Sequence, residues 1–211
     1  NPMDRDPQLL GFSFSAVLLN EMTRPWKSWQ SYPKIGNGSS VYLHSLPSSW
    51  GAVYFGDKWR EFLSFYSVRA KPPFYDLGQE LLVTTPGQPL GDTNLLVPKS
   101  RSNSWKNSWK RFMIDFAYGR GYYMIYPNFP KGAGFSTPLQ LEGEHVQTKG
   151  RRSPHTGPII AAVLPRLVLP ELHQMKVFDL FCKPTSRNSL WKVGDSFLQH
   201  IGELGGEYQP L

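Results

Sequence analysis

Residues 105–145 constrain the fold of this chain more than any other stretch of the sequence. Apolar side chains at i, i+3, i+4 and i+7 from Trp109 onward favour an amphipathic helix. Gly119 and Gly121 then end this helix, because glycine readily adopts the backbone conformation found at helix C-termini. The aromatic and apolar run Tyr122–Tyr126 favours a buried strand. A helix that leads directly into a strand is typical of an α/β fold.

A strand and a helix of the same kind lie upstream. The run WGAVYF at residues 50–55 favours a strand, and apolar side chains at helical spacing follow from Trp59 to Tyr66. Aromatic side chains on the two helices are expected to face the core: Trp59, Phe62, Tyr66, Trp109, Phe112 and Phe116. The sequence therefore predicts an α/β fold, with a mixed sheet flanked by amphipathic helices and a loop-rich C-terminal tail.

The chain has 211 residues, enough for one domain with a tail. We expect residues 1–147 to form an α/β domain that lacks its N-terminal part, because the chain begins at Asn1. Residues 148–211 start with a polar, basic linker and continue with short apolar pieces divided by prolines. They are predicted to pack on the domain. Residues 71–104, rich in Pro, Gly, Asp and Asn, are predicted to form a long irregular connection.

The formal net charge of +7 raises the question of a polyanionic partner. The basic residues are scattered, and no recognisable nucleic-acid-binding module accompanies them, so we expect no nucleic-acid partner. No apolar stretch approaches the length of about 20 residues that a transmembrane helix needs. The single cysteine, Cys182, lies in an apolar run and is predicted to be a buried, unreactive thiol.

Asp115 is the candidate catalytic base. It lies within the second predicted helix, among aromatic residues that could tune its pKa. Helical spacing also places it one turn after Arg111, and a helix acid that faces solvent or pairs with such an arginine is the commoner situation. Both interpretations remain open from the sequence.

Two acidic groups are candidate metal ligands. Glu142, Glu144 and His145 lie in a short glycine-containing loop, and their side chains suit a divalent cation such as Mn²⁺ or Mg²⁺. Asp4 and Asp6 form a D-x-D pattern, in which two acids can hold a metal that bridges a diphosphate. Short acidic patterns of this kind more often face solvent without a ligand, so the spacing is weak evidence for a metal site.

Three segments together resemble a known family. WGAVYFGDKWREFLSFY, SNSWKNSWKRFMIDFAYGRGYYMIYPNF and FSTPLQLEGEHV resemble the downstream half of a GT-A-type glycosyltransferase domain, over about residues 49–147. They are most similar to glycosyltransferase-like proteins of fungi and other eukaryotic microbes. The resemblance implies transfer of a sugar from a nucleotide-sugar donor to a hydroxyl group on a carbohydrate or glycoprotein acceptor.

The resemblance also implies roles for particular residues. Ser49, Trp50 and Gly51 correspond to the turn that lines the acceptor side in GT-A enzymes. Asp115 corresponds to the catalytic base.

The metal site that the resemblance implies combines His145 with Asp4 and Asp6, and Glu144 is the neighbouring candidate ligand. The family relationship would locate the protein in the Golgi or ER lumen, or outside the cell. The competing interpretation is a non-catalytic carbohydrate- or protein-binding module that uses the same aromatic surface. A polyanion-binding protein is the third.

Overall fold

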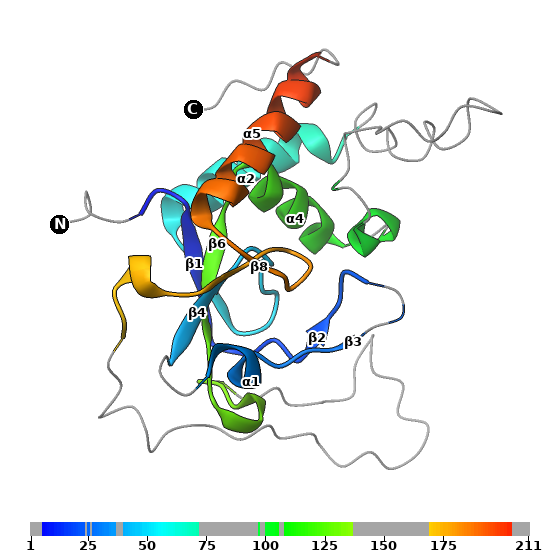
Figure 1. Cartoon of the computed structure of the whole chain (residues 1–211). Coiled ribbons are helices and arrows are strands. Elements are labelled where there is room, and N and C mark those ends of the chain that lie inside the picture. Colours follow the sequence, from blue (N-terminus) through cyan, green and yellow to red (C-terminus); the bar gives the residue numbers. More distant parts are fainter. Residues whose placement is uncertain are drawn as a thin grey trace, which may run out of the picture.

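The computed structural model describes residues 6–23, 25, 27–36, 40–71, 97, 100–105, 108–136 and 169–203. These residues form an α/β structure built on a mixed six-stranded sheet (Figure 1). The strands lie in the order β5 (Ala52–Tyr54), β1 (Leu9–Ser13), β6 (Tyr123–Pro127), β4 (Val41–His44), β7 (Val177–Phe178) and β8 (Pro184–Thr185). The α/β prediction is therefore confirmed, and β5 and β6 lie in the two stretches predicted above as strands.

The directions of the strands define two edges of the sheet. β1 and β6 are parallel, so their carboxyl ends lie at the same edge. β4 runs antiparallel to β6, and β5 runs antiparallel to β1. In open α/β sheets, ligands bind beyond the carboxyl ends of parallel strands. The loops that follow β1 and β6 are thus the first place to look for a site.

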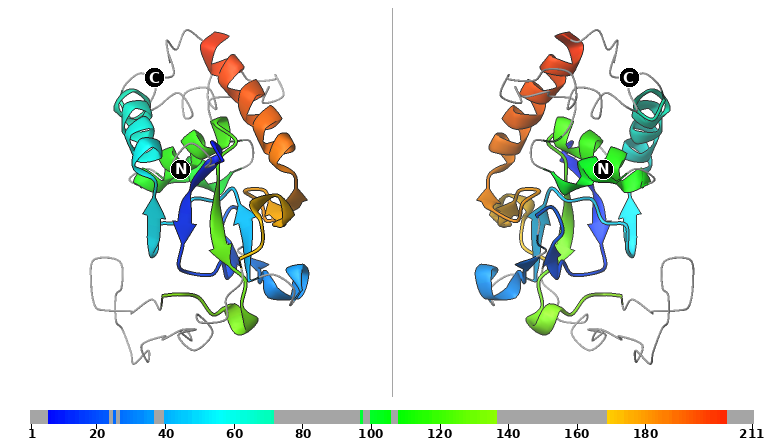
Figure 2. Two further views of the ribbon diagram at one scale, coloured as in Figure 1. Left: turned by 90° about the vertical axis from the view of Figure 1, so that its left-hand side faces the viewer. Right: turned by 90° about the vertical axis from the view of Figure 1, so that its right-hand side faces the viewer.

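The long helices gather at the opposite end of these strands, beyond the amino ends of β1 and β6. These are α2 (Gly56–Arg69), α4 (Trp109–Gly119) and α5 (Arg187–Glu203). Figure 2 shows α4 between α2 and α5, with the arrowheads of β1 and β6 pointing away from all three helices. The smaller elements are α1 (Tyr32–Ile35), β2 (Leu19–Asn20) paired with β3 (Lys27–Ser28), and three short 3-10 helices, η2 (Arg101–Ser104), η3 (Pro130–Gly132) and η5 (Leu172–Gln174).

The structure confirms the predicted burial for three of the six aromatic side chains on α2 and α4. The prediction is confirmed for the side chains that are buried: Phe62, Phe112 and Phe116. It is wrong for the side chains that are 36% to 41% exposed: Trp59, Tyr66 and Trp109. The apolar stripe of each helix is wider than the contact between them, so its outer residues remain partly in water. The rings of Trp59 and Trp109 pack edge to face at this boundary, with centroids 6.1 Å apart.

The C-terminal segment contains more regular structure than the sequence predicts. It supplies β7, β8 and the 17-residue helix α5, where we expected a loop-rich tail. The Ser189 N–H donates to Ser186 Oγ (3.1 Å), which caps the start of α5. Gly194, which disfavours a helix by propensity, allows close packing on α4: a Cβ there would lie 2.7 Å from the Gly119 carbonyl oxygen. Tertiary packing thus outweighs propensity in this helix.

Candidate functional site

Three loops meet beyond the carboxyl end of β1. The Phe14 N–H donates to the Gly51 carbonyl oxygen (2.7 Å), and the Phe135 N–H donates to the Phe14 carbonyl oxygen (2.7 Å). The loop after β1, the turn before β5 and the loop after β6 are therefore joined through their backbones. We call residues 48–51 the Trp50 turn. It contains all three residues that the resemblance places on the acceptor side, and it lies beyond the carboxyl end of β1, where open α/β sheets bind ligands.

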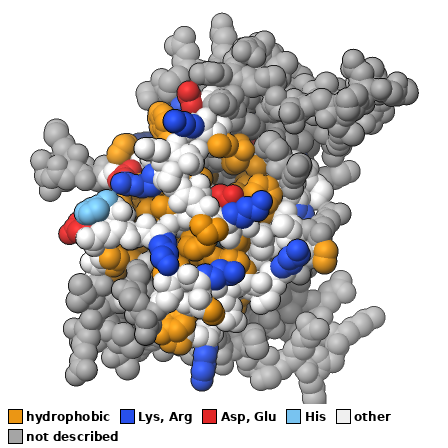
Figure 3. Space-filling model, viewed as in Figure 1, with side chains coloured by type: hydrophobic (Ala, Val, Ile, Leu, Met, Phe, Trp, Pro, Cys, Tyr) orange, Lys and Arg blue, Asp and Glu red, His pale blue; other side chains and the backbone are white. Residues whose placement is uncertain are grey.

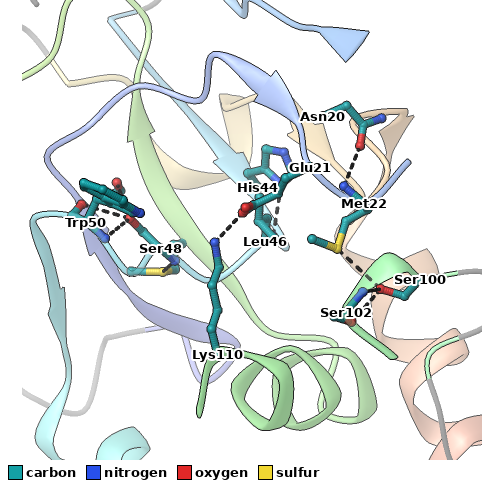
Figure 4. Close-up of polar contacts among 12 residues, drawn as sticks. Asn20, Glu21, Met22, His44, Leu46, Ser48, Trp50, Ser100, Ser102 and Lys110 are labelled. Atoms are coloured by element: carbon teal, nitrogen blue, oxygen red, sulfur yellow. Dashed lines mark hydrogen bonds and ion pairs between the residues drawn. The ribbon is translucent and has the colours of Figure 1, made fainter. Parts of the chain in front are cut away.

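Ser48 fixes the conformation of this turn. Its Oγ donates to the Trp50 carbonyl oxygen (3.0 Å) and accepts from the Trp50 N–H (3.3 Å), as the close-up in Figure 4 shows. Ser13 Oγ donates to Ser48 Oγ (3.0 Å), and the Tyr54 hydroxyl donates to the Ser48 carbonyl oxygen. The turn is thus held from β1 and β5, while the Trp50 side chain remains 65% exposed. A large apolar ring held in water by an ordered turn is available for a ligand.

Serine hydroxyls surround Gly51 within this junction. Gly51 has φ +54°, and a Cβ there would lie 2.9 Å from Ser136 Oγ. Ser136 Oγ lies 3.0 Å from Ser15 Oγ, so the loops after β1 and β6 present neighbouring hydroxyls. The junction therefore combines an exposed indole with uncharged donors and acceptors. The sequence did not identify Ser15 and Ser136, because only the pairing of β1 with β5 and the path of the loop after β6 bring them to Gly51.

Asp115 lies between α2 and α4, beyond the amino ends of β1 and β6. Its side chain is 1% exposed, and Oδ2 pairs with the Arg69 guanidinium (3.3 Å) from the last turn of α2. Burial raises the pKa of Asp115 to about 6, and the charges of Arg69 and Arg111 partly offset this shift. Oδ1 has no hydrogen-bond partner among the described residues. Asp115 is therefore enclosed in the α2–α4 interface with Arg69 and does not open onto a cleft.

This geometry limits what Asp115 can do. A general base must come within hydrogen-bond reach of the acceptor hydroxyl, and a carboxylate closed to solvent does not meet that requirement. Asp115 belongs to α4, at the amino ends of β1 and β6, whereas Trp50 lies beyond the carboxyl end of β1. The catalytic role of Asp115 stays a prediction.

The predicted metal ligands are only partly described. Asp4, Glu142, Glu144 and His145 lie outside the described residues. Both carboxylate oxygens of Asp6 accept hydrogen bonds, Oδ1 from the Gln8 N–H (2.9 Å) and Oδ2 from Arg187 (2.6 Å). Asp6 thus does not present a free carboxylate to a cation. In the part of the chain that the structure describes, no three His, Cys, Asp or Glu side chains gather around a possible metal position.

His44 and Cys182 lie as close together as the two residues of a nucleophilic Cys–His dyad. Burial, however, favours the uncharged form of each side chain. Cys182 Sγ lies 3.5 Å from His44 Nε2, and both side chains are buried. Burial, assisted by the charge of Lys110, lowers the pKa of His44 to about 3. Burial raises the pKa of Cys182 to about 12. Both groups are therefore neutral near pH 7. The predicted burial of Cys182 is confirmed, and burial disfavours a thiolate–imidazolium pair.

Comparisons of this chain with protein-family models, with curated proteins and with solved structures find no match. Among the described residues, none of the helices has both the length and the apolar composition needed to cross a bilayer.

Proposed function

We propose that this protein binds carbohydrate through the Trp50 turn, as the acceptor side of a GT-A-type glycosyltransferase domain. The observation that carries the proposal is the exposed Trp50 indole on a turn fixed by Ser48, next to the hydroxyls of Ser15 and Ser136. A sugar ring has an apolar C–H face and a rim of hydroxyls. An indole contacts the first, and serine hydroxyls can donate to or accept from the second.

The position of the turn supports the same proposal. It lies beyond the carboxyl end of β1, where open α/β sheets bind their ligands. Its polar groups are uncharged hydroxyls and backbone atoms, which suit a neutral sugar better than a charged ligand. Gly51 also keeps the backbone close to Ser136, so the turn and the loop after β6 form one continuous surface.

The proposed reaction is glycosyl transfer. The acceptor hydroxyl oxygen attacks the anomeric carbon of the donor sugar, and the bond from that carbon to the nucleoside diphosphate breaks. The hydroxyl proton passes to a base, and the nucleoside diphosphate leaves. The resemblance assigns the base to Asp115, which would have to become accessible from its buried ion pair with Arg69. The binding step is supported by the geometry of Trp50, and the chemical step by the resemblance alone.

A second candidate function follows from the burial of Asp115. If this carboxylate only holds α2 against α4, the Trp50 turn serves a non-catalytic carbohydrate-binding module. The 1% exposure of Asp115 and its Arg69 partner favour this alternative. The two functions share the carbohydrate site and differ only in whether transfer follows.

Binding is tested by applying the full chain to an array of neutral oligosaccharides and titrating the best binder by calorimetry. We expect Trp50→Ala to weaken binding about tenfold or more, because it removes the apolar contact. Trp191→Ala is the matched control, since Trp191 is 54% exposed on α5 and remote from the turn. Equal affinity of the two variants, or no binding by the wild type, would reject carbohydrate binding at this turn.

Transfer is tested by adding uridine and guanosine diphosphate sugars together with the bound oligosaccharide and measuring release of the nucleoside diphosphate. Asp115→Asn retains the shape of the side chain and removes its basic charge. If Asp115 is the base, turnover falls by about 10²–10⁴-fold while acceptor affinity is retained. Carbohydrate binding without turnover in the wild type would identify the binding module instead.

A further inference from the structure

A separate pocket lies at the β7–β8 edge of the sheet. It is open on one side, has a volume of about 460 Å³, and is bounded by the end of α1, by β7 and β8, and by the first residue of α5. Its charged or titratable lining residues are all basic: Lys34, His173, Lys176 and Arg187. We call it the β7–β8 pocket. Figure 3, which shows the same side of the molecule as Figure 1, has Lys and Arg side chains around exposed hydrophobic ones.

The fold brings these cations together from distant parts of the chain. Lys34 is exposed in the last turn of α1, and Lys176 is exposed directly before β7. The Lys176 ammonium donates to the Ile35 carbonyl oxygen (3.2 Å), so the two lysines lie on the same side of the pocket as α1. Arg187 pairs with Asp6, which balances its charge. Among the described residues that line the pocket there is no acid, so Lys34 and Lys176 leave it positively charged.

The start of α5 adds to this charge. Ser186 and Arg187, at the N-terminus of this 17-residue helix, line the pocket. The N-terminal end of a helix carries a partial positive charge and favours an anion by a fraction of the energy of a full charge. It reinforces the two lysines and does not define the site without them.

Apolar side chains also line the pocket. Met175 and Phe178 are buried, and they line the pocket together with Val177 and Pro184. A pocket of several hundred Å³ with one charged side and one apolar side fits a small organic ligand rather than a lone ion. The charge would select an anionic group, and the apolar wall would contact the carbon skeleton attached to it.

We propose that the β7–β8 pocket binds a small organic phosphate ester. The phosphate lies between Lys34 and Lys176, where two ammonium groups can donate charge-assisted hydrogen bonds to its oxygens. The organic part lies on the wall formed by Val177, Phe178 and Pro184. The pocket is on the side of β7 and β8, whereas the Trp50 turn is next to β5 and β1 at the other side of the strand order. This site is therefore independent of the proposed carbohydrate function.

The test is a titration of the isotope-labelled full chain with phenyl phosphate, followed through backbone amide NMR shifts. We expect shifts concentrated at residues 34–36, 173–178 and 184–187. Phenyl phosphate should bind about tenfold more tightly than inorganic phosphate, because the ring contacts the apolar wall. Phenol should produce no comparable shifts, because it lacks the anionic group.

A matched pair of double variants separates the pocket from the overall charge. Lys34→Gln with Lys176→Gln removes the two pocket lysines, both exposed, and should weaken binding of phenyl phosphate at least about tenfold. Lys183→Gln with Lys192→Gln removes the same charge from exposed positions that do not line the pocket, and should change binding by less than about twofold. Thermal unfolding of both variants checks that the fold is retained. Equal losses in the two variants, or shifts spread over the whole surface, would overturn the proposal.

Discussion

The α2–α4 interface and the Trp50 turn each contain a residue that the sequence singles out, and the structure treats the two residues in opposite ways. Asp115 is 1% exposed and ion-paired, whereas Trp50 is 65% exposed on an ordered turn. A charged residue is thus enclosed and a large apolar residue is in water. The contrast separates two kinds of unusual residue: one whose partner explains its position, and one whose exposed ring is the basis of the proposed carbohydrate site.

Burial explains the importance of the partner in the α2–α4 interface. The Arg69 guanidinium lies 5.6 Å from the centre of the Phe112 ring, so the ion pair sits against an aromatic wall. Removing both charges from water is costly, and their attraction offsets part of that cost. Loss of one partner leaves the other charge buried. In the Trp50 turn the indole of Trp50 is mostly in water, so this side chain can change at little cost to stability.

The largest effect should come from Arg69→Met, which retains an apolar side chain and removes the charge beside Asp115. We expect a loss of about 3–5 kcal/mol in the free energy of unfolding at pH 7 to 8, measured by urea denaturation. Arg60→Met, at an exposed position of the same helix, should cost less than about 0.5 kcal/mol. Adding Asp115→Asn to Arg69→Met should restore part of the loss. Without such restoration, the ion pair is not what holds the interface.

Phe116→Ala should cost about 3–5 kcal/mol, because Phe116 is buried against Phe62, Phe65 and Tyr122. Trp109→Ala, on the same helix but 41% exposed, should cost clearly less. Thermal unfolding of the two variants provides the comparison. Similar losses would contradict the partial exposure of the outer aromatic residues.

The stability of the protein should depend on the protonation of Asp115. Its pKa is about 6 in the folded state and 3.8 as the ordinary value, so the folded state binds the proton more tightly. The stability that protonated Asp115 contributes is therefore fully present below about pH 4 and is lost as the pH rises through about 6. This lowers the free energy of unfolding by about 3 kcal/mol. The free energy of unfolding of the wild type should fall relative to that of Asp115→Asn across this pH range. Above about pH 7 the difference between the two proteins should stay constant. Urea denaturation between pH 4 and 8 measures the difference, and parallel curves throughout would refute the shift.

Gly51→Ala probes the backbone of the Trp50 turn. A non-glycine residue at φ +54° costs roughly 1–2 kcal/mol, and the new Cβ would also meet Ser136 Oγ at 2.9 Å. Chemical denaturation should show this loss of stability. A neutral result would mean that the turn relaxes and that the junction with Ser136 is loose.

The smallest effect on stability should come from Trp50→Ala. Because the side chain is mostly in water, we expect a change within about 0.5 kcal/mol in the same denaturation experiment. The variant should nevertheless lose carbohydrate affinity. A large loss of stability would show that Trp50 packs on the protein, which would remove the main argument for a ligand at this turn.

Local patterns were sufficient to predict two strands of the sheet, β5 and β6, and two helices, α2 and α4. The helical spacing from Trp59 and from Trp109 predicted α2 and α4, and the apolar run after Gly121 predicted β6. Such periodicity depends only on neighbours within a few turns, so it is visible in the sequence. The helix α5 was missed because Pro184 and Gly194 obscure its pattern, and Gly194 is favourable only where α4 approaches.

The sequence by itself also determined that Trp50 and Asp115 are unusual residues, but not what surrounds them. Only the tertiary structure decided that Arg69, 46 positions away, pairs with Asp115. It likewise brought Ser15 and Ser136, separated by 121 positions, to the Trp50 turn, and Lys34 and Lys176 to one pocket. The physical reason is the separation along the sequence over which each feature is determined. Side-chain periodicity is set by the local backbone, whereas ion pairs and binding surfaces depend on how distant segments pack, which no local pattern records.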